Sequence, residues 1–563
     1  MRSGGLSLVD YKDDVIISSY VAQSQLAKEN KAFWEKIRNQ YEQQRNQIKL
    51  GGGLPNIEKQ HQKGRLSVRE RLNLLLDKGT TFFELGIFVA YEMYEEWGGC
   101  PAGGTITGIG TISGRQCMVI ANDATVKAGS FFPMTAKKVI RAQKIALENR
   151  IPTVYLVDSS GIFLPLQEDV FPDTDDFGRV FYLNALMSSR GIPQITAIMG
   201  MCVAGGAYLP VMCDSLIMTE GSGLFLAGPA LVKAAIGQVV EAEELGGAGM
   251  HAAISGTVDF KEKDDPSAIR RIRDLVARIG NHERMIYQKK DTQEPVYRPE
   301  ELDGLMPSDP MKEYDTREVI ARLVDNSQFT EYKKDYGRSL VCGYARIGGY
   351  AIGIVANQKK HYIEKGRPPE FGGVIYSESA AKATRFIMDC NQNINPILFI
   401  HDVNGFMVGR DAEQSGIIRE GAKMVNAVSN TTVPKLSLII GGTFGAGHYA
   451  MCGKAYEPRF IFAWPTARYA VMGGAQAANT LVDIRIRQLE REGNKLSEEE
   501  RAALFKSVKE TYDHQTDPRY GAARLWIDEI IFPRNTREVL IQALTIVCSN
   551  PELEKFNPGV IQT

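Results

Sequence analysis

Two glycine-rich segments of this chain, "CVAGGAY" and "GTFGAGHY", offer the groups best suited to bind an anion. Their small residues are Ala204, Gly205 and Gly206 in the first segment, and Gly445, Ala446 and Gly447 in the second. Each segment follows an apolar run and precedes an apolar stretch that favours a helix. Small residues let a bound group approach the backbone, and amides at the start of a helix carry partial positive charge. Both segments therefore predict binding of a phosphate or of an oxyanion.

The phosphate alternative fails at specific residues. In a P-loop the Gly-Lys pair is followed by Ser or Thr, whereas Lys454 is followed by Ala455 and the earlier glycine position holds His448. In a dinucleotide-binding G-x-G-x-x-G loop the last glycine position holds Ala450. An oxyanion developing from a carbonyl group suits the same amides. The sequence therefore favours oxyanion stabilisation.

The sequence shows no side-chain nucleophile or base shared by the two segments. Ser159 and Ser160 lack a surrounding G-x-S-x-G, so a serine hydrolase is only an alternative hypothesis. His448 in the second segment corresponds to Ala207 in the first. Two oxyanion sites without a protein base favour a reaction that stabilises two enolate-like species while a cofactor supplies the base.

The two segments belong to an internal repeat. Gly200/Gly441, Gly206/Gly447 and Tyr208/Tyr449 are each 241 residues apart, and Pro152/Pro396, Asp158/Asp402 and Gly161/Gly405 are each 244 apart. A period of about 240 residues is far longer than the roughly 20–50 residues of solenoid repeats. The repeat therefore predicts two copies of one domain.

The elements of each copy alternate between strand and helix, which predicts an α/β fold. We expect an N-terminal helical arm in residues 1–58, containing a charged amphipathic helix at 20–47, and two domains at 59–305 and 306–563. Near the start of the first domain, Ser67 and Glu70 have the spacing of a capping box. A charged insertion at 485–515 is expected to be helical.

Composition excludes several classes of function. The 563 residues carry a net charge of −1, so nothing indicates nucleic-acid binding, and no basic amphipathic helix indicates a membrane surface. Apolar runs stop short of the roughly 18 residues that span a bilayer. The eight cysteines include no C-x-x-C pair, which predicts reduced thiols and no metal site. We expect a cytoplasmic protein in a bacterium, or a mitochondrial matrix protein in a eukaryote.

Several longer motifs resemble those of one family. They include "GRLSVRERLNLLLD", "FPDTDDFGRVFY", "CVAGGAYLPVMCD", "GFMVGRDAEQSGIIREGAKMV" and "GGTFGAGHYAMCGKAYEPRF". The chain resembles the carboxyltransferase (β) subunits of biotin-dependent acyl-CoA carboxylases from about residue 45 to 550, most closely the 3-methylcrotonyl-CoA members, which act in leucine catabolism. This resemblance implies two tandem crotonase-superfamily (ClpP/crotonase-like) domains that arose by duplication.

The resemblance also implies a reaction and partners. Carboxybiotin on a biotin carboxylase/biotin carboxyl carrier (α) subunit would donate the carboxyl group to an acyl-CoA. The Ala204-Gly205 amides would hold the thioester oxyanion and the Ala446-Gly447 amides the biotin ureido oxygen. A homohexameric core (β6 within α6β6) is implied, with no metal in this subunit.

Further site residues are expected on the same basis. Those expected to bind substrate are Gly161, Phe181, Tyr182, Lys127 and Tyr208, and those expected to bind biotin are Phe406, Phe444 and Tyr449. Ser159-Ser160 replaces a glycine pair typical of the family, and the segment after Ala356 is longer than usual. The alternatives are a decarboxylase of the glutaconyl-CoA decarboxylase α type, a carboxylase for propionyl- or geranyl-CoA, and a noncatalytic crotonase-like scaffold.

Overall fold

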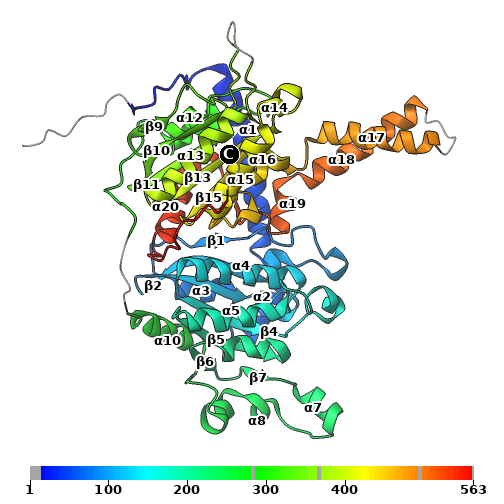
Figure 1. Ribbon diagram of the computed structural model, residues 1–563. Coiled ribbons are helices and arrows are strands. Elements are labelled where there is room, and N and C mark those ends of the chain that lie inside the picture. Colours follow the sequence, from blue (N-terminus) through cyan, green and yellow to red (C-terminus); the bar gives the residue numbers. More distant parts are fainter. Residues whose placement is uncertain (1–13, 281–285, 364–368, 492–496, 561–563) are drawn as a thin grey trace, which may run out of the picture. The chain divides into compact units, whose positions relative to one another are not determined.

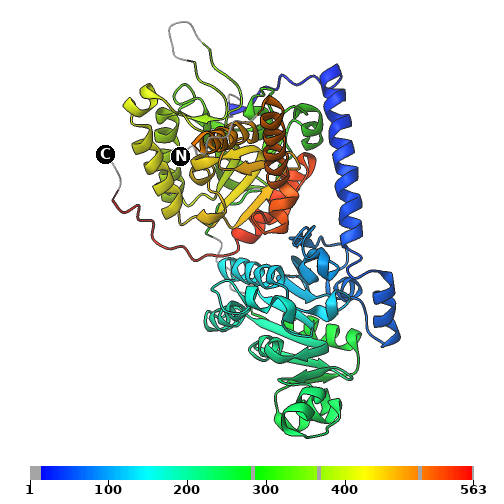
Figure 2. The same cartoon turned by 90° about the vertical axis from the view of Figure 1, so that its right-hand side faces the viewer.

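The computed structural model describes residues 14–280, 286–363, 369–491 and 497–560. The chain divides into two compact units. The N-unit contains Gln40–Arg284 and Arg519–Glu529, and the C-unit contains Met1–Asn39, Met285–Pro518 and Ile530–Thr563. Figures 1 and 2 show each unit as a twisted sheet covered by helices.

The sheet of the N-unit follows the order β1-β2-β3-β4-β5-β6-β8, with β7 paired to β5. Its strands are β1 (Phe83–Leu85), β2 (Thr105–Ile112), β3 (Arg115–Asn122), β4 (Thr153–Ser159), β5 (Gln194–Val203), β6 (Ser215–Thr219), β7 (Gly223–Phe225) and β8 (Phe260–Glu262). Strands β1 to β3 pair antiparallel, and β3 to β6 pair parallel. The central strands are buried along most of their length because helices cover the sheet.

The sheet of the C-unit repeats this topology, in the order β18-β16-β15-β13-β11-β10-β9 with β17 paired to β15. Its strands are β9 (Thr330–Tyr332), β10 (Leu340–Ile347), β11 (Tyr350–Asn357), β13 (Ile397–Val403), β15 (Lys435–Phe444), β16 (Phe460–Ala463), β17 (Arg468–Ala470) and β18 (Glu529–Ile530). A further pair, β12 (Val374–Ile375) and β14 (Gly405–Phe406), lies outside the main sheet. The matching strand orders confirm the predicted α/β class and the duplication.

The principal helices of the N-unit are α2 (Leu54–Gln62), α3 (Val68–Leu75), α4 (Pro133–Asn149), α5 (Phe177–Ser189), α6 (Tyr208–Val211), α7 (Pro229–Ile236) and α10 (Asp265–Ala277). Those of the C-unit are α12 (Thr316–Ala321), α13 (Ser377–Gln392), α15 (Ile417–Asn430), α16 (Gly445–Ala450) and α20 (Thr536–Val547). The predicted capping box is confirmed at the start of α3, where the Ser67 side chain accepts from the Glu70 amide.

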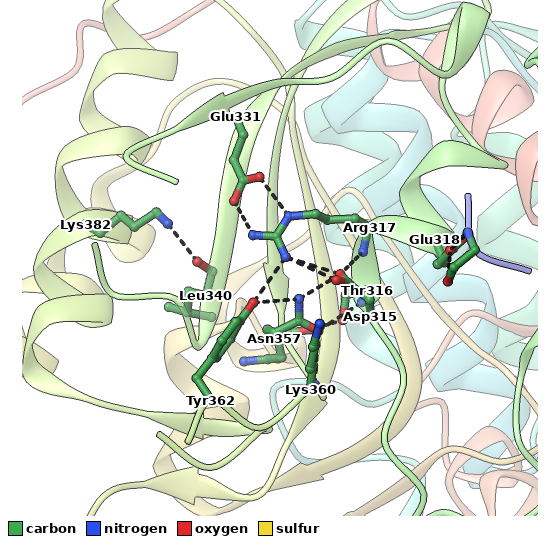
Figure 3. Close-up of polar contacts among 12 residues, drawn as sticks. Asp315, Thr316, Arg317, Glu318, Glu331, Leu340, Asn357, Lys360, Tyr362 and Lys382 are labelled. Atoms are coloured by element: carbon green, nitrogen blue, oxygen red, sulfur yellow. Dashed lines mark hydrogen bonds and ion pairs between the residues drawn. The ribbon is translucent and has the colours of Figure 1, made fainter. Parts of the chain in front are cut away.

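Helices α4 and α13 occupy equivalent places and each carries a buried lysine. The Lys138 ammonium donates to the carbonyls of Ala102 and Thr105 at 2.8 and 2.7 Å. The Lys382 ammonium donates to the Leu340 carbonyl at 3.0 Å, as Figure 3 shows. Both ammonium groups therefore tie a helix to its sheet.

The predicted N-terminal helix is confirmed as α1 (Gln25–Ile48). Its residues up to Asn39 belong to the C-unit, where the Trp34 indole N–H donates to the Met306 carbonyl at 3.2 Å. Trp34 also packs edge-on against Trp464, with ring centroids 6.2 Å apart. The apolar side of this part of the helix thus packs against the chain's own C-unit.

The charged insertion forms two helices, α17 (Gly474–Arg491) and α18 (Glu498–Gln515), which contact each other. Figure 1 shows the pair side by side, extending away from the sheet of the C-unit. Among the described residues, no helix is long and apolar enough to cross a membrane.

Candidate active site

The amide loop of the N-unit begins where β5 ends. A single 3-10 turn, Ala204–Ala207, follows Val203 and leads directly into α6. Ala204 has φ +57°, a left-handed conformation that costs an alanine about 1–2 kcal/mol. The first amides of a helical segment lack some of its internal partners, and at the start of this turn Gly205 is half-buried and Gly206 is buried.

The amide loop of the C-unit has the same backbone shape. Strand β15 ends at Phe444, and α16 begins at Gly445 with φ +54°. Gly445 lies 241 residues after Ala204, so the two left-handed positions are equivalent. The Ala204-Gly205 pair therefore corresponds to Gly445-Ala446, one residue before the Ala446-Gly447 pair. In this loop Ala446 is exposed and Gly447 is buried.

A glycine that comes just after the neighbouring central strand, β4 or β13, lies beside each loop. A Cβ on Gly206 would lie 3.6 Å from the Cα of Gly161, and a Cβ on Gly447 would lie 3.3 Å from the Cα of Gly405. Gly161 and Gly405 also have positive φ, at +88° and +134°. The structure thus brings the predicted substrate residue Gly161 next to the N-unit loop.

A buried aspartate lies beneath the N-unit loop. Asp158 stands at a register irregularity of β4, and its carboxylate is 3.4 Å from the Arg71 guanidinium. Arg71 also pairs with Asp265 at 2.8 Å and donates to the Met199 carbonyl at 3.1 Å. A Cβ on Gly200 would lie 1.9 Å from the Asp158 carboxylate, so only glycine leaves room for that side chain.

The equivalent aspartate of the C-unit contacts its loop more directly. Asp402 pairs with Lys359 at 3.0 Å and accepts from the Tyr314 hydroxyl at 2.8 Å. It also accepts from the Gly442 amide at 3.0 Å, just before the loop. A Cβ on Gly441 would lie 2.5 Å from its carboxylate. Sequence reasoning used Asp158 and Asp402 only as markers of the repeat, although their constant offset from the glycines was a signal of this packing.

A polar network holds the start of the long segment that follows β11 (Figure 3). The Arg317 guanidinium donates twice to Glu331, at 2.6 and 2.8 Å, and once to the Tyr362 hydroxyl at 3.2 Å. These bonds fix the path of the backbone after β11, and this path places Lys359 beside Asp402. Residues 364–368 of this segment lie outside the described residues.

Aromatic rings line the N-unit loop. The Phe177 ring lies 2.9 Å from where a Cβ on Gly205 would stand. Ring centroids are 5.0 Å apart for Phe177 and Phe181, and 6.1 Å apart for Phe181 and Tyr208. The structure thus brings Phe181 and Tyr208 together beside the loop. Sequence reasoning missed Phe177, although its i, i+4 spacing from Phe181 on a helix was the available signal.

The other predicted substrate residues lie at the edges of this region. Tyr182 is 54% exposed, and the Arg179 guanidinium stacks on its ring at 4.3 Å. Lys127 is exposed and begins a turn that packs on the end of β4, where the Ser160 amide donates to the Ala128 carbonyl at 3.1 Å.

Two of the three predicted biotin residues, Phe444 and Tyr449, flank the C-unit loop along the chain. Phe444 is the last residue of β15, and Tyr449, in α16, is 49% exposed. Phe406 follows Gly405 and packs partly buried against the core of the C-unit. Tyr449 therefore offers the most accessible aromatic surface of the three.

The geometry disfavours a serine nucleophile. Ser159 is buried and accepts from the Gly161 amide at 3.2 Å, and the Ser160 hydroxyl lies 2.8 Å from that of Ser130. In the part of the chain that the structure describes, neither Ser159 nor Ser160 hydrogen-bonds to a histidine. The same residues include no group of three or more His, Cys, Asp or Glu that could hold a metal ion.

Duplicated α/β units with an amide loop at the end of the same strand define a crotonase-like enzyme. Comparison with known proteins gives its family: the model for the carboxyl transferase domain matches residues 59–559. The chain belongs to the carboxyl transferase family and is a carboxyltransferase.

Relatives and solved structures agree with this assignment. The chain is 46% identical to the probable mitochondrial methylcrotonoyl-CoA carboxylase beta chain of Drosophila melanogaster, over 95% of this chain and 93% of that one. It is also 46% identical to the biotin-dependent 3-methylcrotonyl-coenzyme A carboxylase beta1 subunit of Mycobacterium tuberculosis, over 91% and 94%. The beta subunit of geranyl-CoA carboxylase from P. aeruginosa superposes with a TM-score of 0.84 at 35% identity, over 98% and 99%.

Proposed function

We propose that this chain is the carboxyltransferase subunit of a biotin-dependent carboxylase that converts 3-methylcrotonyl-CoA to 3-methylglutaconyl-CoA. The observation that carries the proposal is the pair of equivalent amide loops, one in each copy of a carboxyltransferase fold. The acyl group is proposed from the two relatives that are 46% identical over more than nine-tenths of the chain.

The N-unit loop is proposed to hold the acyl-CoA. Amides of Ala204, Gly205 and Gly206 would donate to the thioester oxygen, which gains negative charge when the γ-carbon loses a proton. Preformed donors at the end of a buried strand stabilise that charge without reorganisation. Phe181 and Tyr208 would line the acyl pocket, and Tyr182, Gly161 and Lys127 would contact the rest of the substrate.

The C-unit loop is proposed to hold the ureido oxygen of biotin through amides of Gly445, Ala446 and Gly447. Bound carboxybiotin would supply both the carboxyl group and the base. The residues present fit a neutral ring with one carbonyl, because Ala446 is exposed and Tyr449 offers an accessible aromatic face. Phe406 and Phe444 would complete the wall of this site. No metal is required by this scheme.

The partners are proposed with the function. We expect a biotin carboxylase/biotin carboxyl carrier (α) subunit and a β6 core within an α6β6 assembly, in a bacterial cytoplasm or a mitochondrial matrix. We also propose a division of labour between an acyl-CoA domain at 59–305 and a biotin domain at 306–563, after a helical arm at 1–58.

The test is carboxyl transfer by the complex with its biotinylated partner, supplied in turn with methylcrotonyl-, geranyl-, propionyl- and glutaconyl-CoA. We expect the highest kcat/KM for carboxylation of methylcrotonyl-CoA. Preference for geranyl-CoA, which the P. aeruginosa structure supports as the second candidate, would replace the proposed substrate. Decarboxylation of glutaconyl-CoA alone would reverse the proposed direction.

The amide role has its own test at Ala446. Proline there removes one amide, whereas glycine keeps it and serves as the matched control. We expect Ala446→Pro to lower kcat by about 100-fold or more, the range seen when one oxyanion donor is removed, and Ala446→Gly to lower it far less. Ala204 does not allow this test, because its φ of +57° is incompatible with proline. A folded Ala446→Pro enzyme with full activity would refute the oxyanion role of this amide.

A further inference from the structure

Two histidines of the C-unit meet at a single hydroxyl group beside the amide loop. The Thr443 hydroxyl lies 3.1 Å from Nδ1 of His401 and 3.0 Å from Nδ1 of His448. Thr443 is in β15, two residues before the loop, and His448 is in the first turn of α16, just after it. His401 lies on the neighbouring strand β13. The contacts therefore connect both ends of the loop to the strand beneath it.

The hydrogen-bonding capacity of these groups makes the arrangement directional. A threonine hydroxyl has one proton to donate, so it donates to one imidazole and accepts the Nδ1–H of the other. The two rings must therefore hold complementary tautomers. Burial supports neutral rings: it lowers the pKa of His448 to about 4 and also lowers the pKa of His401. With both rings neutral, one ring carries its proton on Nδ1 and the other carries it on Nε2.

The surroundings hold the His448 ring in place. A Cβ on Gly453 would lie 2.2 Å from its Nε2, so the glycine backbone packs closely on the ring. The Gly453 amide donates to the His448 carbonyl at 2.8 Å. The ring is thus enclosed between Thr443 and Gly453, which restricts its rotation.

The N-unit has no such arrangement. The positions equivalent to His401, Thr443 and His448 are Val157, Cys202 and Ala207. There the Cys202 thiol donates to the Gly206 carbonyl at 3.2 Å. At these equivalent positions the N-unit loop is therefore held without a histidine.

A proton relay does not explain the pair. His401 is completely buried, and burial lowers its pKa well below the ordinary value, so its ring does not take up a proton at neutral pH. A role in holding the loop fits the contacts better, since each bond joins two segments that meet at the loop.

We propose that His401, Thr443 and His448 are positioning residues that hold the C-unit amide loop in its ligand-binding shape. The inference rests on the proposed function for its catalytic consequence, because that function places biotin at this loop. This positioning role makes the biotin step of the reaction depend on the Thr443 hydroxyl, whereas binding of the acyl-CoA does not depend on it.

The matched variants are Thr443→Val, which removes the hydroxyl at nearly constant shape, and Thr443→Ser, which keeps it. Hydrogen–deuterium exchange read by mass spectrometry on peptides covering 441–452 tests the loop without any assay of activity. We expect exchange in these peptides to rise at least tenfold in the valine variant and less than threefold in the serine variant, with peptides of the N-unit loop unchanged. Unchanged exchange in a folded valine variant would overturn the proposal.

Kinetics then test the catalytic consequence in the complex with its biotinylated partner. We expect the valine variant to lose about 10- to 100-fold in kcat, with KM for acyl-CoA within twofold of the native enzyme and activity retained by the serine variant. Changed exchange with unchanged kcat would keep the positioning role and refute biotin binding at this loop. A native complex inactive on every acyl-CoA would refute the proposed function, while the exchange result would still decide the inference.

Discussion

The close packing of Gly200 on Asp158 leads to a quantitative prediction. In Gly200→Ala the new Cβ would lie 1.9 Å from the carboxylate, about 1.5 Å inside the 3.4 Å at which ordinary contact begins. Neither β4 nor β5 can move by that distance, because both are central strands of the sheet. The Asp158 side chain must therefore move, and it loses its ion pair with Arg71, whose groups are 3.4 Å apart.

The cost combines two effects. Overpacking a close-packed core costs about 1–3 kcal/mol, and breaking a buried ion pair costs about 3–5 kcal/mol. Arg71 keeps its ion pair with Asp265, so only part of the cost of breaking a buried ion pair applies. We expect Gly200→Ala to lower the free energy of unfolding of the N-unit by about 3–5 kcal/mol.

The assay is native-state hydrogen exchange of peptides from β4 and β5, because it reports on the N-unit without assuming that the chain unfolds in one step. Gly228→Ala is a control, since nothing lies within 4 Å of a Cβ at that position. A double-mutant cycle locates the cause. In an Asp158→Ala background the Gly200 substitution should cost much less, whereas in Asp158→Asn, which keeps the volume, it should cost nearly as much. Equal costs in all three backgrounds would refute the reasoning.

Three further outcomes follow from particular residues. Burial lowers the pKa of Lys138 to about 8, below its ordinary 10.5, so the unfolded chain binds more protons than the folded chain between these pH values. The free energy of unfolding should therefore rise from about pH 8 to pH 10.5, by up to about 1.4 kcal/mol per pH unit. Urea unfolding at each pH should show this slope in the native chain and not in Lys138→Met. Ala204→Gly should raise stability by about 0.5–1 kcal/mol and Gly445→Ala should lower it by about 1–2 kcal/mol, because both positions are left-handed. Thermal unfolding measures both changes, and a change in the same direction for the two variants would contradict this prediction. Ser67→Ala should cost about 1 kcal/mol through loss of the N-cap of α3, and a change below 0.3 kcal/mol in urea unfolding would contradict it.

The sequence by itself determined the duplicated α/β architecture and the place of the two amide loops. Both are carried by local patterns: apolar runs that become strands, glycines at the ends of those strands, and constant offsets between the copies. The carboxyltransferase motifs are equally local, so they predict the family without the tertiary structure. The same local reasoning located Ser67 as the cap of a helix.

The tertiary structure alone decided what lies beneath and beside the loops. Asp158 meets Arg71, 87 residues away in the sequence, and Asp402 meets Tyr314, 88 residues away. The contacts of Thr443 with His401 and His448 likewise depend on two adjacent strands and the turn between strand and helix. No periodicity of the chain encodes such contacts, because they arise where side chains from different elements compete for the same buried space.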